Sequence, residues 1–180
     1  YTKTSHNDIR TRSELLRKRW DERLEISDKD IKNYERTLAI RGLLFRLDED
    51  YETHLKLAKI CRRENMYTTC MIVLNRLSKH LEHCDTNISV NVKLNISKCL
   101  TENNNQRDSQ QAITNLKYII DNEIHNINDK LKSKIYCYYA IWNSKSSLTN
   151  EENVNDILTY LDLSTKYNAN NYKAWHHYAM

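Results

Sequence analysis

The chain of 180 residues contains no proline and a single glycine, Gly42. Tight turns between β-strands depend on these two residues, because glycine adopts and proline fixes backbone angles that other residues avoid. A β-sheet domain of this length needs many such turns, and the sequence does not provide them. The composition otherwise suits a folded domain, with 39% hydrophobic and 29% charged residues. The sequence therefore predicts an all-α fold.

Apolar residues recur three or four positions apart along most of the chain, which is the spacing of one helix face. Breaks between helices are expected at Ser27 and Asp28, at Asp48 to Asp50, and at Asn65. A last helix is expected to begin within residues 168–180. The apolar residues that mark the other expected helices are Leu16, Trp20 and Leu24; Ile31, Tyr34, Leu38 and Phe45; Tyr51, Leu55, Ala58 and Cys61; Cys70, Leu74, Leu77 and Leu81; Ala112, Ile113, Leu116, Ile119 and Ile120; Leu131, Ile135, Tyr138 and Trp142; and Val154, Ile157, Leu158 and Leu161.

Three stretches depart from this helical spacing. In "NISVNVKLNI" (87–96) apolar and polar residues alternate, which is the period of a strand. We nevertheless expect a helix there, because a lone strand would have no partner. The polar stretches "TENNNQRDSQ" (101–110) and "NSKSSLTNEEN" (143–153) are expected to be loops.

The expected helices come in pairs with the period of a helical-repeat solenoid. The fold class predicted is a tetratricopeptide-like α-solenoid of antiparallel helix pairs, as one segment over residues 1–180. We divide it into 1–48 (first pair), 49–83 (tetratricopeptide-like pair), 84–150 (divergent pairs with polar loops) and 151–180 (last pair, truncated). The tetratricopeptide positions fall on His54, Leu57, Ala58 and Cys61, then on Cys70, Leu74 and Leu77.

Few residues suggest chemistry. With one glycine no phosphate-binding loop can form. His80, His83 and Cys84 in "HLEHC", and the adjacent His176 and His177, are possible metal ligands, but surface histidines explain them better. Cys137 in "IYCYYAIW" lies among apolar residues that do not suit a catalytic thiol. The five cysteines are expected to be reduced and buried, as in an intracellular protein. We expect no metal site and no catalytic residue in this segment.

The net charge of +4 is too small to predict nucleic-acid binding. Arg12, Arg17, Lys18 and Arg19 form a basic stretch that is most simply a solvated helix face, with an acidic partner as the alternative. Lys29, Lys56 and Arg63 fall on neighbouring expected segments. If those segments stack, their side chains would converge on one polyanion.

Several segments resemble a known domain. "LLRKRWDERL" (15–24), "YERTLAIRGLL" (34–44) and "DEDYETHLKLAKICRREN" (48–65) look like consecutive parts of a FAT domain, and "NYKAWHHYA" (171–179) resembles its tyrosine–lysine–alanine–tryptophan–histidine helix. FAT domains occur in the phosphatidylinositol-3-kinase-related protein kinases. Within that family the segments are most similar to those of the target of rapamycin (TOR) kinases.

The resemblance implies a C-shaped scaffold and regulatory α-solenoid that clamps the kinase domain of the same chain. The parent would be a serine/threonine kinase that uses ATP and magnesium outside this segment. Implied partners are the subunits of TOR complexes, with no nucleic acid and no membrane span. The implied location is the cytoplasm, including the surface of vacuolar or lysosomal membranes. The alternatives are the FAT segment of another kinase of the family, such as a DNA-damage kinase, and a stand-alone tetratricopeptide adaptor that binds peptides. The segments "WDERL" and "LAKICR" argue against the first alternative.

The resemblance also implies an inositol hexakisphosphate site. Its basic residues would be Lys29, Lys56, Arg63 and Lys173, with Lys93 a weaker match. The chain departs from the family at Tyr136 and Ala140, where an arginine and a lysine are usual; Lys134 is a substitute for one of them. Tyr172 and Trp175 would be packing residues, so that Trp175→Ala would destabilise the last repeat by roughly 3–5 kcal/mol.

Overall fold

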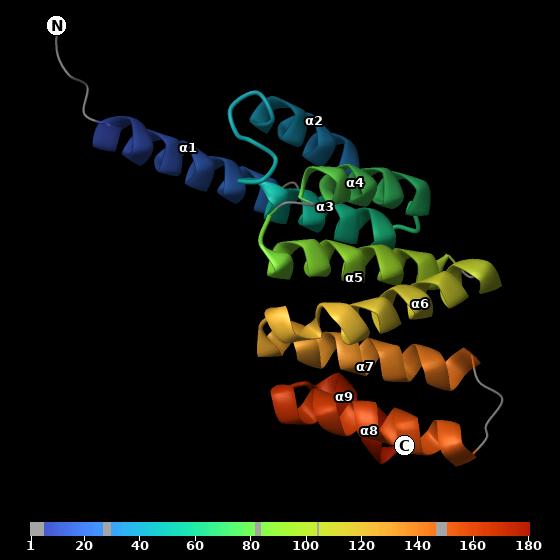
Figure 1. Cartoon of the computed structure of the whole chain (residues 1–180). Helices are drawn as coiled ribbons and strands as arrows, with labels where there is room; N and C mark the ends of the chain where they lie inside the picture. Colours follow the sequence, from blue (N-terminus) through green and yellow to red (C-terminus); the bar gives the residue numbers. More distant parts are fainter. Residues whose placement is uncertain (1–5, 27–29, 82–83, 104, 147–150) are drawn as a thin grey trace, which may run out of the picture.

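A computed structural model describes residues 6–26, 30–81, 84–103, 105–146 and 151–180. The all-α prediction is confirmed, since every regular element in these ranges is helical (Figure 1). None of the described helices is long and apolar enough to cross a membrane. The elements are α1 (His6–Ile26), α2 (Ile31–Arg41), α3 (Tyr51–Arg63), α4 (Tyr67–His80), α5 (Thr86–Glu102), α6 (Gln106–Asn122), the 3₁₀ turn η1 (Ile124–Asn126), α7 (Asp129–Ser146), α8 (Glu151–Tyr167) and α9 (Tyr172–Ala179).

Successive helices stack into a solenoid, and α1 projects from one end of the stack (Figure 1). The helices α3 and α4, α5 and α6, and α7 and α8 pack most extensively as pairs, and α9 follows α8. In addition, α3 contacts α5, α5 contacts α7, and α7 contacts α9. These four helices therefore form one continuous layer, which we call the odd-helix face. The expected division after residue 150 separates α7 from α8, its main packing partner.

Short polar side chains begin several of the helices. Asp30 precedes α2, and its carboxylate accepts hydrogen bonds from the backbone N–H groups of Lys32 and Asn33 at 3.0 and 3.3 Å. Asp85, Asn105 and Asn171 cap α5, α6 and α9 in the same way. The expected break at Ser27 and Asp28 lies outside the described residues. The expected break at Asn65 is confirmed, since this residue has a φ of 59° between α3 and α4.

The alternating stretch 87–96 is helical, as expected, and its burial explains the pattern. Helix α5 lies between two hydrophobic clusters. Val90 and Leu94 belong to the cluster toward the C-terminus, whereas Val92 and Cys99 belong to the cluster toward the N-terminus. A helix that is buried on two sides needs apolar residues on both, and that requirement imitates the period of a strand.

Both predicted loops are wrong over most of their length. Only residues 103–105 separate α5 from α6, α7 continues to Ser146, and α8 begins at Glu151. Asparagine, serine and glutamine are tolerated in helices when packing favours them, and neither stretch contains a proline or a glycine. A further difference is Phe45, which was expected on the second helix. It lies in the turn after Arg41 and is buried there beneath the guanidinium groups of Arg17 and Arg41.

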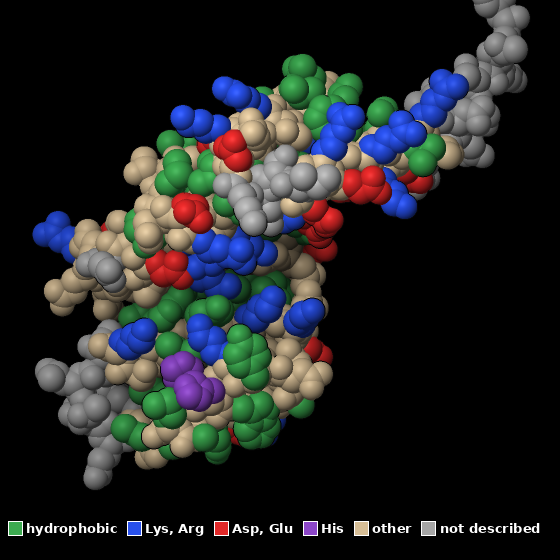
Figure 2. Space-filling view, turned by 180° about the vertical axis from the view of Figure 1, so that it is seen from behind, with side chains coloured by type: hydrophobic (Ala, Val, Ile, Leu, Met, Phe, Trp, Pro, Cys, Tyr) green, Lys and Arg blue, Asp and Glu red, His purple; other side chains and the backbone are tan. Residues whose placement is uncertain are grey.

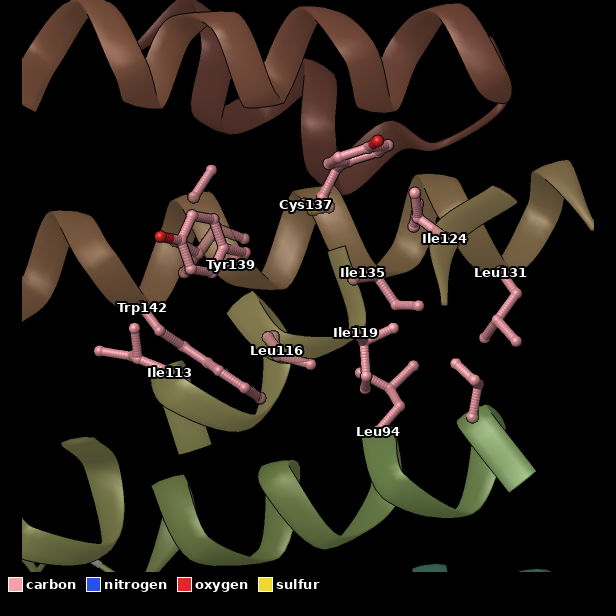
Figure 3. Close-up of a cluster of buried hydrophobic side chains, with 14 of the residues drawn as sticks. Leu94, Ile113, Leu116, Ile119, Ile124, Leu131, Ile135, Cys137, Tyr139 and Trp142 are labelled. Carbon is pink, nitrogen blue, oxygen red and sulfur yellow. The ribbon is translucent and has the colours of Figure 1, made fainter. Parts of the chain in front are cut away.

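The hydrophobic cluster toward the C-terminus fills the space between α5, α6 and α7. Leu94, Leu116, Ile119 and Ile135 meet there, with Trp142 at one end (Figure 3). The tetratricopeptide positions Leu57, Ala58, Cys61, Cys70, Leu74 and Leu77 lie in the other cluster, whereas His54 is only half-buried. The expectation of buried, reduced cysteines is confirmed for Cys61, Cys70, Cys99 and Cys137, and Cys84 is exposed.

The expected packing of Tyr172 and Trp175 is wrong for this chain. Tyr172 is 83% exposed and Trp175 is 50% exposed, whereas Ala174 between them is fully buried. Asn171 caps this helix by accepting a hydrogen bond from the backbone N–H of Ala174 at 3.4 Å. Trp175 still donates a hydrogen bond from its indole nitrogen to the backbone oxygen of Ala169 at 2.8 Å.

One buried cation joins the first three helices. The guanidinium of Arg41 donates two hydrogen bonds to the carboxylate of Asp50, at 3.0 and 2.5 Å, and one to Asp21 on α1 at 2.8 Å. Arg41 is 1% exposed and Asp50 is 4% exposed. Burial alone would lower the pKa of Arg41, but the two carboxylates outweigh it and raise that pKa. We call this set the Arg41 network.

Candidate functional site

Basic side chains from four helices gather on the odd-helix face. Figure 2 shows Lys and Arg side chains grouped across the middle of the molecule when it is seen from behind. The members that act on one another electrostatically are Lys59 and Arg62 from α3, Lys98 from α5, Lys134 from α7 and Lys173 from α9. We call these five residues the lysine cluster. They come together because α3, α5, α7 and α9 lie side by side.

Tyr138 of α7 organises the centre of the lysine cluster. The amine of Lys98 lies 4.3 Å from the centroid of its ring, and the amine of Lys173 lies 4.4 Å from the same centroid. The face of an aromatic ring attracts cations, so Tyr138 holds an amine from each neighbouring helix. Burial is the main cause that raises the pKa of the Tyr138 hydroxyl, which stays neutral.

The lysine cluster is short of carboxylates. Arg62 is paired with Glu102. Within the described residues, Lys59, Lys98, Lys134 and Lys173 form no ion pair. Burial, followed by the charges of Arg62, Lys134, Lys59 and Lys173, lowers the pKa of Lys98 from 10.5 to about 7. Burial also lowers the pKa of Lys134, aided by Lys130 and Lys59. Such a group of cations repels itself and favours an anion.

A cavity of about 880 Å³ adjoins the lysine cluster, between α1, α2, α3 and α5. The predicted site residues Lys56 and Arg63 line it together with Lys59, which also belongs to the lysine cluster. The cavity is lined by as many acidic as basic side chains, among them Glu25 and Glu52. Its balanced charge makes it a poorer polyanion site than the lysine cluster itself.

The other predicted site residues are placed differently. Lys173 lies in the lysine cluster, as does Lys134, the expected substitute. Lys93 is instead bound to the carboxylate of Glu123 at 2.5 Å, so its charge is already neutralised within the fold. Lys29 lies outside the described residues.

The two departures from the family pattern are part of the hydrophobic core. Ala140 is fully buried. Tyr136 is 7% exposed and stacks between the rings of Tyr160 and Tyr167, with centroids 5.9 and 5.8 Å away. Helix α8 therefore covers the Tyr136 side of α7, and the side that carries Lys134 and Tyr138 faces the lysine cluster.

The alternative metal and thiol sites find little support in the geometry. Among the described residues no three His, Cys, Asp or Glu side chains lie close enough to hold a metal ion; His83 is outside those residues. The rings of His176 and His177 meet edge to face, with centroids 5.4 Å apart. Burial raises the pKa of the Cys137 thiol, which disfavours the nucleophilic thiolate.

Sequence reasoning missed Lys59, Arg62, Lys98 and Tyr138. The basic residues of α3 fall at 56, 59, 62 and 63, so helical spacing alone places them along one strip of that helix. No comparable local signal exists for Lys98 and Tyr138, since their meeting depends on how α5 and α7 stack.

A family model for the FAT domain matches residues 1–180. The chain belongs to the FAT-domain family. It is 25% identical over 192 residues to "Serine/threonine-protein kinase TOR" of Arabidopsis thaliana, in an alignment that covers 94% of this chain and 8% of the plant protein. It is 22% identical over 197 residues to "Serine/threonine-protein kinase mTor" of Drosophila melanogaster, covering 95% of this chain and 8% of that protein. The resemblance to TOR kinases is thus confirmed, and this FAT segment spans less than a tenth of the length of those relatives.

Proposed function

We propose that this FAT segment is a scaffold and regulatory solenoid of a TOR-type serine/threonine kinase. Support comes from the family match over the whole chain, from the two TOR relatives and from the continuous stack of helices. The segment supports the kinase domain of its own chain and carries surfaces for TOR complex subunits in the cytoplasm or at vacuolar and lysosomal membranes. ATP and magnesium act in that kinase domain, and no catalytic residue comes from this segment. Changes in the curvature of the stack then shift the kinase between arrangements.

The gene that encodes this chain provides the first test. A kinase domain encoded downstream of Met180 is the expected result. A gene that continues only with regular helix pairs would instead favour a tetratricopeptide adaptor and overturn the proposal.

The second part of the proposal is that the lysine cluster binds an inositol polyphosphate such as inositol hexakisphosphate. The observation that carries it is a group of four lysines on four stacked helices, which form no ion pair with any residue that the structure describes: Lys59, Lys98, Lys134 and Lys173. A multiply charged phosphate ligand would satisfy these amines through charge-assisted hydrogen bonds and join the helices that supply them. Lys56 and Arg63 lie at the edge of the site, on the same helix as Lys59.

Isothermal titration of inositol hexakisphosphate into the chain tests this binding. We expect Lys98→Ala and Lys173→Ala each to weaken binding by about tenfold or more, since a hydrogen bond to a charged group contributes about 1.5–3 kcal/mol. Lys117→Ala, an exposed lysine of α6, is the matched control and should leave the affinity unchanged. Equal affinities for the three variants and the parent would reject the site.

A further inference from the structure

Lys98 has an unusual position among the described lysines, because cations from three other helices, α3, α7 and α9, act on it. Lys59 and Arg62 face it from α3, Lys134 from α7 and Lys173 from α9. The carboxylate of Glu102, one turn further along α5, is paired with Arg62.

Among the described residues, two neutral groups and one histidine also lie near this set of charges. Tyr138 lies against the amine, the buried Cys137 thiol is nearby, and His177 lies beyond Lys173. Because the pKa of Lys98 is about 7, its amine is protonated in only part of the molecules near neutral pH. Removing the repulsion of the neighbouring cations would restore the proton.

We propose that Lys98 is a proton-linked ligand-binding residue: a polyanion that binds the lysine cluster causes the Lys98 amine to take up one proton from solvent. This inference rests on the proposed inositol polyphosphate site. The proton forms an N–H bond with the lone pair of the amine, and the buffer supplies it. The ligand's negative charge offsets Lys59, Arg62, Lys134 and Lys173, so the charged form of Lys98 becomes favourable. Linkage then requires that binding becomes tighter as the pH falls toward 7.

Other titratable groups near the lysine cluster are less suited to take up a proton when the ligand binds. Burial lowers the pKa of His177, followed by the effects of His176, Lys173 and Lys145, so this ring titrates in the acidic range. Lys134 has a lowered pKa but is exposed. Lys98 combines partial burial with the influence of four cations, whereas two act on Lys134.

The test uses inositol hexasulfate, whose sulfate groups remain fully ionised from pH 6 to 9, so that any proton taken up goes to the protein. Calorimetric titration at pH 8 in two buffers of different ionisation enthalpy measures this number. We expect uptake of a large fraction of one proton for each ligand bound, and binding that is about tenfold tighter at pH 7 than at pH 8.5, as linkage to one proton allows.

Two variants assign the proton. Lys98→Arg keeps a permanent positive charge, and should bind at pH 8.5 at least as tightly as the parent, without proton uptake. His177→Asn should retain the uptake. Hexasulfate binding by the parent without proton uptake, or unchanged uptake by a folded Lys98→Arg, would overturn the inference but leave the binding site intact. An absence of hexasulfate and hexakisphosphate binding at every pH would overturn the proposed site itself.

Discussion

Two cations inside this solenoid have opposite surroundings. Arg41, between α1, α2 and α3, is almost fully buried and donates hydrogen bonds to two carboxylates. Lys98, in the layer of odd-numbered helices, is partly buried among four other cations and forms no ion pair with a described residue. The pKa of Arg41 is raised and that of Lys98 is lowered. A buried cation with its counter-charges holds a fold together, whereas one without them weakens the fold and is available to a ligand.

The largest expected effect comes from removing the paired cation. Arg41→Met leaves the Asp50 carboxylate buried without a counter-charge, although the Thr53 hydroxyl still donates a hydrogen bond to it. Removal of one member of a buried ion pair typically costs about 3–5 kcal/mol. Urea unfolding followed by circular dichroism measures the loss. Arg46→Met, whose side chain is 78% exposed, is the control and should cost less than about 0.5 kcal/mol.

A double variant sharpens this result. Arg41→Met combined with Asp50→Leu removes both buried charges and should recover a large part of the stability lost in Arg41→Met, because the carboxylate left without its partner, Asp21, is half-exposed to solvent. A double variant as unstable as the sum of the two single variants would show that Arg41 acts through packing on Phe45 and not through Asp50.

The next largest expected effects are two changes in stability of opposite sign, caused by replacing two lysines of α5. Lys93→Met should destabilise the chain by about 1–2 kcal/mol, since it removes the partner of Glu123, whose second carboxylate oxygen is already buried without a hydrogen bond. Lys98→Met should instead stabilise the chain, on the order of 1 kcal/mol once solvent screening is allowed for. Thermal unfolding of both variants at pH 6 compares them directly. Destabilisation by both would break the comparison between paired and unpaired cations.

The gain from Lys98→Met should depend on pH. The folded state lowers the pKa of Lys98 from 10.5 to about 7, so the folded chain binds fewer protons than the unfolded chain between these values. The destabilisation by Lys98 is therefore complete below pH 7 and disappears as the pH rises toward 10.5. The difference in melting temperature between Lys98→Met and the parent should shrink from pH 6 to pH 9.5. A constant difference would mean that the methionine acts through packing alone.

The smallest expected effect lies at the end of the stack, away from both cations. Trp175→Ala should cost about 1 kcal/mol in the chain, well below the loss for a fully buried ring, because half of the indole is already exposed and one hydrogen bond is lost. Unfolding in urea would measure it. A loss of 3–5 kcal/mol would show that the ring is packed as the sequence alone had suggested.

Much of the fold can be predicted from the sequence because the signals for helix formation lie within short segments. The absence of proline, the apolar stripes and the caps lie within single segments, and they gave the helical class and the helix centres. The prediction of loops at 101–110 and 143–153 was wrong because asparagine and serine suit both loops and packed helices. Packing against the neighbouring helices favours the helical structure in both stretches.

The site was only partly readable. Lys173 could be named through the resemblance of "YKAW" to a known motif, and Lys134 through its position beside Tyr136. Lys98 and Tyr138 could not be named, because their contact joins α5 to α7 across 40 residues of sequence. Conversely, Lys93 matched a basic position but the fold pairs it with Glu123. Charge in a sequence does not reveal which carboxylates will stand beside it.

The titration of the Lys98 amine itself tests the central claim most directly. Carbon NMR of lysine labelled at the ε position, assigned with Lys98→Arg, follows this one group through the pH range. The account predicts a midpoint near pH 7 in the free chain, and a midpoint that moves upward when inositol hexasulfate is added. A midpoint close to the ordinary 10.5 for the free chain, unchanged by the hexasulfate, would contradict it.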